Sequence, residues 1–236
     1  MKKGIVYLIF LFAISSLAFP QQEVWVSVGY EFGYFADRYK NQGETIETGT
    51  FSRGMNISSY SFFTNSLGIF AHGSFLSPKN SWIWNDNGIS NVDLSNYPFN
   101  MDIGLIIGLA FKIDFTDDFK SYFGIGFNWF TTSAMYPGIG TISYSRKTNN
   151  FGIGGDIGLK VDISDRFFLR LGSILTLDFA RNTVIETYTG TSLASTSREW
   201  NDKYIMLSAR PYFAVGLNLF WRNDNDRLRL SLGKPN

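Results

Sequence analysis

The sequence lacks cysteine, has a single histidine and is poor in charged side chains. Charged residues make up 17% of its 236 residues, against roughly 25% in ordinary soluble domains, and the formal net charge is only +1. Without cysteine, neither a disulfide framework nor a cysteine–histidine zinc site can form. A net charge near zero provides no bulk field that would attract nucleic acid. We therefore expect no nucleic-acid partner, no bound metal and no cofactor.

Long apolar runs are also missing, except for one at the N-terminus that extends from Gly4 to about Phe19 behind two lysines. This run is too short for a confident helical span, which needs roughly 20 residues. Its order of positive charge, apolar core and small residues is that of an export signal. We expect a signal peptide at residues 1–18, cleaved after Ala18, with an uncleaved signal anchor as the alternative.

What the sequence does contain is alternation. Successive side chains of a β-strand point to opposite faces, so a period of two separates two faces. In the segment 151–163 one parity is apolar, while the other carries glycine, aspartate and lysine. The apolar parity holds Phe151, Ile153, Ile157, Leu159, Val161 and Ile163. This pattern predicts a strand with one apolar face and one small or polar face.

Eight segments alternate in this way, although the parity of the second and third is ambiguous. We expect strands at about 23–36, 55–63, 67–76, 99–115, 120–132, 150–163, 166–180 and 204–221. Their connections alternate between tight Asp, Asn and Ser turns and long polar segments at 37–54, 77–98, 133–149 and 181–203. In an antiparallel meander, all the long connections then lie at one rim. Outer-membrane barrels have this asymmetry, with short periplasmic turns and long external loops.

The composition of the polar face separates a membrane barrel from a soluble one. Glycine weakens strands, so a face in water would favour Lys, Glu and Thr over glycine. Here that face is rich in glycine, for example Gly104, Gly108, Gly124 and Gly126. Small residues suit the crowded interior of a narrow barrel. The sequence predicts an eight-stranded antiparallel up-and-down transmembrane β-barrel with four long external loops; the alternative is a soluble lipocalin-like ligand binder.

Over residues 23–221 the chain resembles the small eight-stranded outer-membrane proteins of the OmpX-, OmpA-barrel- and OmpW-like group. The resemblance rests on this architecture and on no family-specific motif. It implies an outer-membrane location, a barrel at 19–221 in contact with lipid, a monomeric state and insertion by the barrel assembly machinery. Such proteins often end in an aromatic residue on the last strand. Phe220 and Trp221 fit that role, but residues 222–236 follow them, and we expect a periplasmic tail there.

Charged residues of both signs fall on the inward parity, and we expect them to form a charge network in the lumen. The expected network comprises Glu31, Asp102, Lys112, Asp156, Lys160, Arg170, Asp178 and Arg210. In a barrel of this size they would form a plug of ion pairs and hydrogen bonds. The alternative is a narrow pore for small or apolar solutes, in which the same residues set selectivity.

Two other groups of residues are candidates for function. His72 and Ser74 share a face of one strand and are similar to the His-x-Ser pair of outer-membrane lipid A deacylases, but they come early in the chain and lack a suitable acid. We therefore expect no enzyme, and keep a lipid-modifying activity as a further alternative. Aromatic and basic residues of the long loops are candidates for binding host or matrix molecules. They are Trp82, Trp84, Tyr97, Tyr136, Arg146 and Lys147. The expected role is structural or in surface interaction.

Overall fold

The computed structural model describes residues 23–41, 44–85, 88–93, 101–137, 142–189, 192–196 and 205–219, all in strands or in the short turns between them. The strands are β1 (Glu23–Asn41), β2 (Glu44–Phe62), β3 (Leu67–Asn85), β4 (Gly88–Asp93), β5 (Met101–Asp114), β6 (Phe119–Pro137), β7 (Ile142–Asp162), β8 (Phe167–Thr189), β9 (Ser192–Thr196) and β10 (Ile205–Leu219). Within these ranges, no helix has the length and apolar character that crossing a membrane requires.

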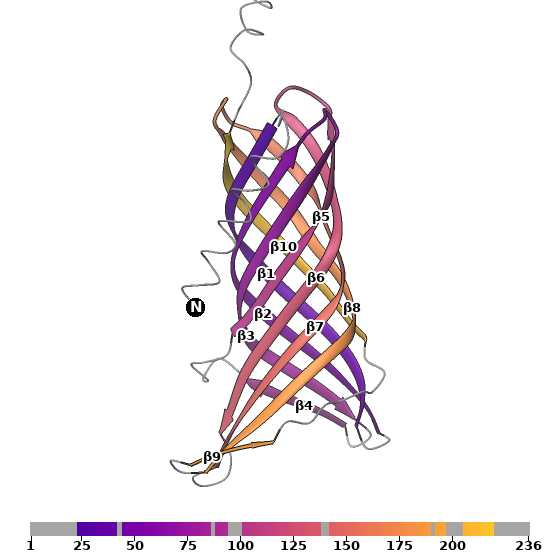
Figure 1. Cartoon of the computed structure of the whole chain (residues 1–236), viewed down its shortest axis with the longest axis vertical. Coiled ribbons are helices and arrows are strands. Elements are labelled where there is room, and N and C mark those ends of the chain that lie inside the picture. The colour runs from indigo at the N-terminus through magenta and orange to yellow at the C-terminus, as the bar shows by residue number, and fades with distance from the viewer. Residues whose placement is uncertain are drawn as a thin grey trace, which may run out of the picture.

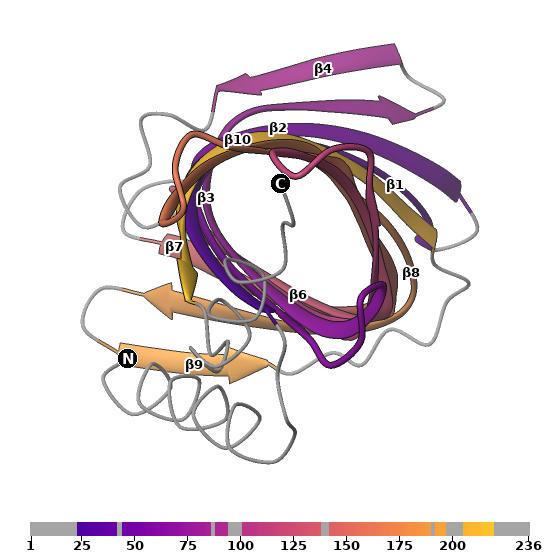
Figure 2. The ribbon, with the colours of Figure 1, turned by 90° about the horizontal axis from the view of Figure 1, so that it is seen from above.

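Eight of the strands form a closed barrel (Figures 1 and 2). The ring runs β1-β2-β3-β5-β6-β7-β8-β10, each strand antiparallel to its neighbours, and β10 pairs with β1 to close it. The remaining two strands, β4 and β9, pair with the ends of β3 and β8 and lie outside the ring (Figure 2). The predicted eight-stranded up-and-down barrel is confirmed.

Tight turns join the strands at one end of the barrel. Thr64, Thr116 and Ser164 each open a turn, and their hydroxyl oxygens accept hydrogen bonds from the backbone N–H three residues on at 2.8, 3.0 and 3.2 Å. A Ser or Thr side chain that mimics a backbone turn in this way favours a short connection. The same end holds the start of β1 and the end of β10, because Glu23 pairs with Phe62 beside the first turn and Val24 pairs with Leu219. This is the periplasmic end.

The outer face of the barrel is apolar and exposed. In β10 the exposed and buried positions alternate almost throughout the strand. Leu171 is 62% exposed and Val215 60% exposed, and similar side chains cover the outer faces of β5, β6, β7, β8 and β10. A surface of this extent and apolarity does not face water in a soluble protein. The outer face therefore contacts membrane lipid, and the soluble lipocalin-like alternative is rejected.

The strands are longer than their alternation indicates. β8 has 23 residues, about twice the 9–11 that cross a bilayer at a tilt. The hairpin of β1 and β2 continues its pairing as far as Asn41 and Glu44, so much of the expected loop 37–54 is strand. Beyond the membrane neither face needs to be apolar, so these polar extensions give no alternating signal. The ladder of backbone hydrogen bonds nevertheless continues through them, and they project as long hairpins.

Close approach of backbones explains two of the inward glycines. Gly108 and Gly126 oppose each other across β5 and β6. A Cβ atom added to Gly126 would lie 2.1 Å from the backbone oxygen of Ile107, and one added to Gly108 would lie 2.0 Å from that of Ile125. Neither backbone oxygen can move aside as a flexible side chain would. The strands can pack this closely only because both positions are glycine.

Candidate functional site

The interior of the barrel is filled with side chains. All eight residues expected in the lumen are buried, and the most exposed of them, Lys112, is 7% exposed. They do not form one continuous network. Going from the periplasmic end outward, they belong to a charged base, an arginine–carboxylate core, a crossing arginine and two separate aspartates.

The charged base holds more residues than the expected network includes. The Lys120 Nζ lies 2.8 Å from an Asp162 oxygen and 3.8 Å from a Glu23 oxygen. Lys112 also contacts Glu23, and Lys160 contacts Asp162. Glu23, Lys120 and Asp162 are absent from the expected network, although their inward parity in the alternating pattern would have identified them. Ion pairs between these charges link strands β1, β5, β6 and β7 at the periplasmic end of the barrel.

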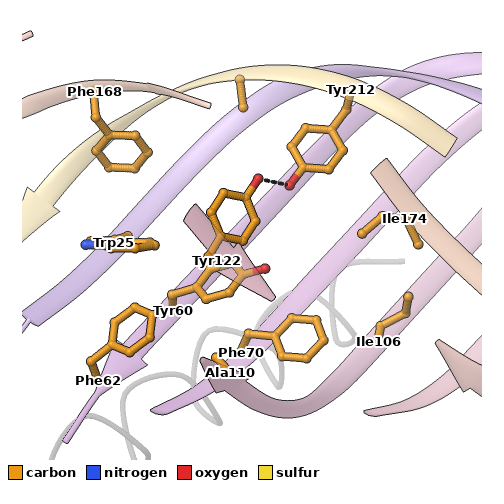
Figure 3. Close-up of a cluster of buried hydrophobic side chains, with 11 residues drawn as sticks. Trp25, Tyr60, Phe62, Phe70, Ile106, Ala110, Tyr122, Phe168, Ile174 and Tyr212 are labelled. Carbon is orange, nitrogen blue, oxygen red and sulfur yellow. Dashed lines mark hydrogen bonds between the residues drawn. The ribbon is translucent and has the colours of Figure 1, made fainter. Parts of the chain in front are cut away.

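A layer of aromatic rings lies next to the base, and the Lys160 Nζ is 4.7 Å from the ring centre of Trp25. The ring of Trp25 is 4.7 Å from that of Phe62 and 5.7 Å from that of Tyr60, and Tyr60 is 5.4 Å from Tyr122. Each of these rings is at most 2% exposed. They come from β1, β2 and β6 and point toward one another in Figure 3. The cluster also includes Phe70, Ile106, Ala110, Phe168, Ile174, Tyr212 and Ala214. This level of the lumen is packed like a protein core.

Arg170 is embedded in this layer and forms the arginine–carboxylate core. Its guanidinium donates to Asp156 at 3.0 Å and to the Tyr212 hydroxyl at 2.6 Å. The guanidinium carbon also lies 4.6 Å from the ring centre of Tyr60 and 4.4 Å from that of Tyr122. Both Tyr60 and Tyr212 in turn donate to Asp156. A buried charge is tolerated only when it is paired and hydrogen-bonded, and this one is both.

Arg210 crosses the lumen from β10. Its Nη1 lies 3.1 Å from the Ser74 hydroxyl and 3.6 Å from a Glu31 oxygen. On β5, a Cβ atom added to Gly104 would lie 2.8 Å from the same Nη1. Glycine at this position leaves room for the guanidinium to reach the facing wall.

His72 and Ser74 are both fully buried next to Glu31. The Ser74 hydroxyl donates to the Glu31 carboxylate at 2.9 Å, and His72 Nε2 lies 2.9 Å from the same carboxylate. The other ring nitrogen, Nδ1, faces Asp156 at 3.8 Å. A serine nucleophile needs its hydroxyl on a base that accepts the proton, usually a histidine. Here the hydroxyl donates to a carboxylate that also contacts the histidine, and all three side chains are fully buried.

Two aspartates lie nearer the external end, without a cation at ion-pair distance in the described part of the chain. Asp102 accepts from Ser52 at 2.9 Å, and Asp178 accepts from Asn128 at 2.6 Å. Several polar atoms in this half have no hydrogen-bond partner among the described residues. They include both amide atoms of Asn56 and the Nε and Nη2 of Arg210. The described residues contain no group of three or more metal-binding side chains.

The expected loop candidates are only partly described. Trp82 lies in β3, half-buried, opposite Gly49 and Asn91. The backbone of the others, except Tyr97, belongs to strands β3, β6 and β7. The side chains of Trp84, Tyr136, Arg146 and Lys147, and the whole of Tyr97, lie outside the described residues. Residues 1–22 and 220–236, with the expected signal peptide and tail, also lie outside them.

Comparisons with known proteins agree with this architecture. The model of the outer membrane protein beta-barrel domain family matches residues 5–193. Among solved structures, OprG from Pseudomonas aeruginosa is 11% identical, with 86% of this chain and 98% of that chain covered and a TM-score of 0.54. AlkL, solved in lipid bilayers, is 12% identical, with 87% and 94% covered and a TM-score of 0.50. Such low identities bear on the fold alone. No curated protein matches the sequence.

Proposed function

Because the chain belongs to the outer membrane protein beta-barrel domain family and is an outer-membrane protein, we propose that it acts as a closed structural barrel that presents its long external hairpins to partners at the cell surface. The observation that carries this proposal is the filled lumen. At the level of Trp25, Tyr60 and Tyr122 the aromatic rings are at most 2% exposed and belong to one cluster, which supports a lumen closed to water. If no solute passes through the lumen, the external hairpins are the parts of the protein that can contact other molecules.

The hairpins support a surface role by their length. β7 has 21 residues and β8 has 23, so each exceeds the membrane-crossing length by about ten residues. The short strands β4 and β9 widen the projecting sheet further (Figure 1). Regular hairpins present side chains on a rigid support, which lowers the entropy lost on binding. External host or matrix molecules are the proposed partners, and no catalytic step is part of the proposal.

Electrical conductance tests the closed lumen. Purified, refolded protein in a planar bilayer should pass no steady ionic current. A variant in which Trp25 and Tyr122 are both replaced by alanine should conduct, because it removes two rings of the closing layer. The matched control is Leu171→Ala, which shortens a lipid-facing side chain of similar depth and should stay closed. Steady conductance of the unaltered protein would contradict the proposal.

Binding to cells tests the surface role. Cells that display the intact protein are compared with cells whose β3–β5 and β8–β10 connections are cut to short turns. Glycans and matrix proteins on an array serve as probes. We expect binding that the shortened variant loses while its folded form still resists SDS until heated. Equal binding by both variants would refute a role for these hairpins.

A second candidate function is a narrow pore for small solutes. It is favoured by the unpartnered polar atoms of Asn56 and Arg210 in the external half of the lumen, because such atoms are normally satisfied by water. For this function the aromatic layer would have to open. A current in the unaltered protein that changes ion selectivity with Lys160→Ala would establish the pore and replace the first proposal.

A further inference from the structure

Arg53 is a cation on the outward, lipid-contacting side of β2. Along this strand the inward residue Ser52 is fully buried, whereas Arg53 is exposed and the next outward residue, Met55, is 58% exposed. Across the neighbouring strands Arg53 pairs with Phe32 and Ser77. Phe32 is itself outward and 39% exposed. The guanidinium therefore extends from the outer face and cannot join the charged groups of the lumen.

The register sets the height of Arg53 on the barrel. A path that starts at Glu23 and steps from each residue to its pairing partner on the next strand goes once around the barrel. It returns to β1 beside Gly33, about ten residues beyond Glu23. The strands are therefore tilted, and residues at one height are offset by about one residue per strand.

With that offset, Arg53 is level with outward apolar side chains around the barrel. The residues at its height include Tyr34 on β1, Phe75 on β3, Trp129 on β6 and Leu207 on β10. Aromatic side chains gather at the two interfaces of membrane barrels. Two outward positions beyond Phe51, on the same strand, Glu47 has a 54% exposed side chain. Arg53 thus lies at the boundary between the lipid-facing surface and the external hairpins.

No carboxylate balances this charge in the described part of the chain. The other outward arginine nearby, Arg38, lies 3.5 Å from Glu47 and is paired with it. Arg53 has no such partner among the described residues. An arginine on the lipid face is strongly destabilising at the bilayer centre and much less so near the interface. At the interface, a negatively charged lipid group is the counter-ion within reach.

We propose that Arg53 binds the phosphate of a phosphorylated lipid in the outer leaflet. A guanidinium presents a planar fork of N–H donors that matches two phosphate oxygens. The Ser77 hydroxyl is on the directly opposed outward position and offers a further donor. Phe32 and Phe75, 39% and 43% exposed, flank the pair and contact the acyl chains of the same lipid. The tight turns lie at the opposite end of the barrel, so this lipid belongs to the external leaflet. This site does not depend on what the hairpins bind.

The test measures lipid binding by the full refolded chain. The probes are a diphosphorylated lipid A, the same lipid after removal of its phosphates, and inorganic phosphate. Native mass spectrometry of the protein in detergent counts the bound lipids during titration. We expect the unaltered protein to bind the phosphorylated lipid at least tenfold more tightly than the dephosphorylated one, and inorganic phosphate to compete only weakly.

Substitutions locate the binding to Arg53. Arg53→Gln should weaken binding of the phosphorylated lipid about tenfold, Arg53→Lys should keep part of it, and Arg38→Gln should leave it unchanged. Because Arg53 is exposed, each variant should fold and keep its heat-dependent mobility in SDS gels. Equal affinity of Arg53→Gln and the unaltered protein would overturn the proposal. So would equal binding of the two lipids, or full displacement by inorganic phosphate.

Discussion

Replacing Arg170 with methionine removes the charge at the centre of the lumen while keeping most of the side-chain volume. The change deletes hydrogen bonds to Asp156 at 3.0 Å, to the Ser27 hydroxyl at 3.0 Å and to the Ser58 hydroxyl at 2.7 Å. It also deletes the bond to Tyr212 and leaves Asp156 as a buried carboxylate without a cation. Breaking a buried ion pair from one side typically costs about 3–5 kcal/mol. We expect a loss in this range for Arg170→Met.

A double-mutant cycle isolates the ion pair from the packing. In the Arg170→Met protein, Asp156→Asn removes the stranded charge, so the second change should restore about 1–3 kcal/mol. In the unaltered protein, Asp156→Asn alone should be destabilising, because it leaves the buried guanidinium unpaired. The sign of the effect of Asp156→Asn therefore reverses with the residue at position 170.

Equilibrium unfolding in urea, with the protein in lipid vesicles, measures these free energies. Tryptophan fluorescence and SDS-gel mobility follow the same transition, and Trp25 reports from the aromatic layer itself. Arg166→Met, in an exposed turn, is the matched control and should change stability by no more than about 0.5 kcal/mol. A loss below about 1 kcal/mol for Arg170→Met would mean that water reaches Asp156 and that the lumen is not closed at this level.

Three further predictions concern the wall of the barrel and the buried histidine. Gly126→Ala should cost about 1–3 kcal/mol of unfolding free energy, because the added Cβ would lie 2.1 Å from a backbone oxygen. The nearest atom to a Cβ on Gly73 is a side-chain methyl at 3.4 Å, so Gly73→Ala should cost less in the same urea titration. Pro211 has no N–H, and the β1–β10 pairing skips positions 210 and 211. Pro211→Ala supplies a backbone donor there, so the new amide at position 211 should exchange slowly with solvent; fast exchange of that amide would show that the gap has another cause. His72→Ala should leave the lipid A acylation pattern of cells unchanged by mass spectrometry, and a shift in that pattern would revive the deacylase alternative.

Much of the barrel could be read from the period of two. In β8 and β7 the alternation already separates lipid-facing from lumen-facing side chains, so the inward positions of Arg170 and Asp156 followed from parity. The tight turns followed from their Ser, Thr and Asp residues. The extensions of β1 and β2 beyond the membrane did not, because a polar hairpin in water has no apolar face to reveal its pleat. In β2 and β3 the alternation was hidden because several outward positions hold serine or glycine and not large apolar residues.

Parity says which face a side chain occupies, and it does so because the pleat is a local property of the backbone. It says nothing about height or about partners on other strands. Those depend on the stagger of the closed barrel, which only the tertiary structure sets. The stagger brings Arg210 across the lumen to Ser74 and places it near Glu31 of the neighbouring strand β1. It leaves Asp102 and Asp178 without a cation in the described part of the chain. Alternation along the chain sets the two faces of the wall, and closure of the barrel sets which interior charges meet.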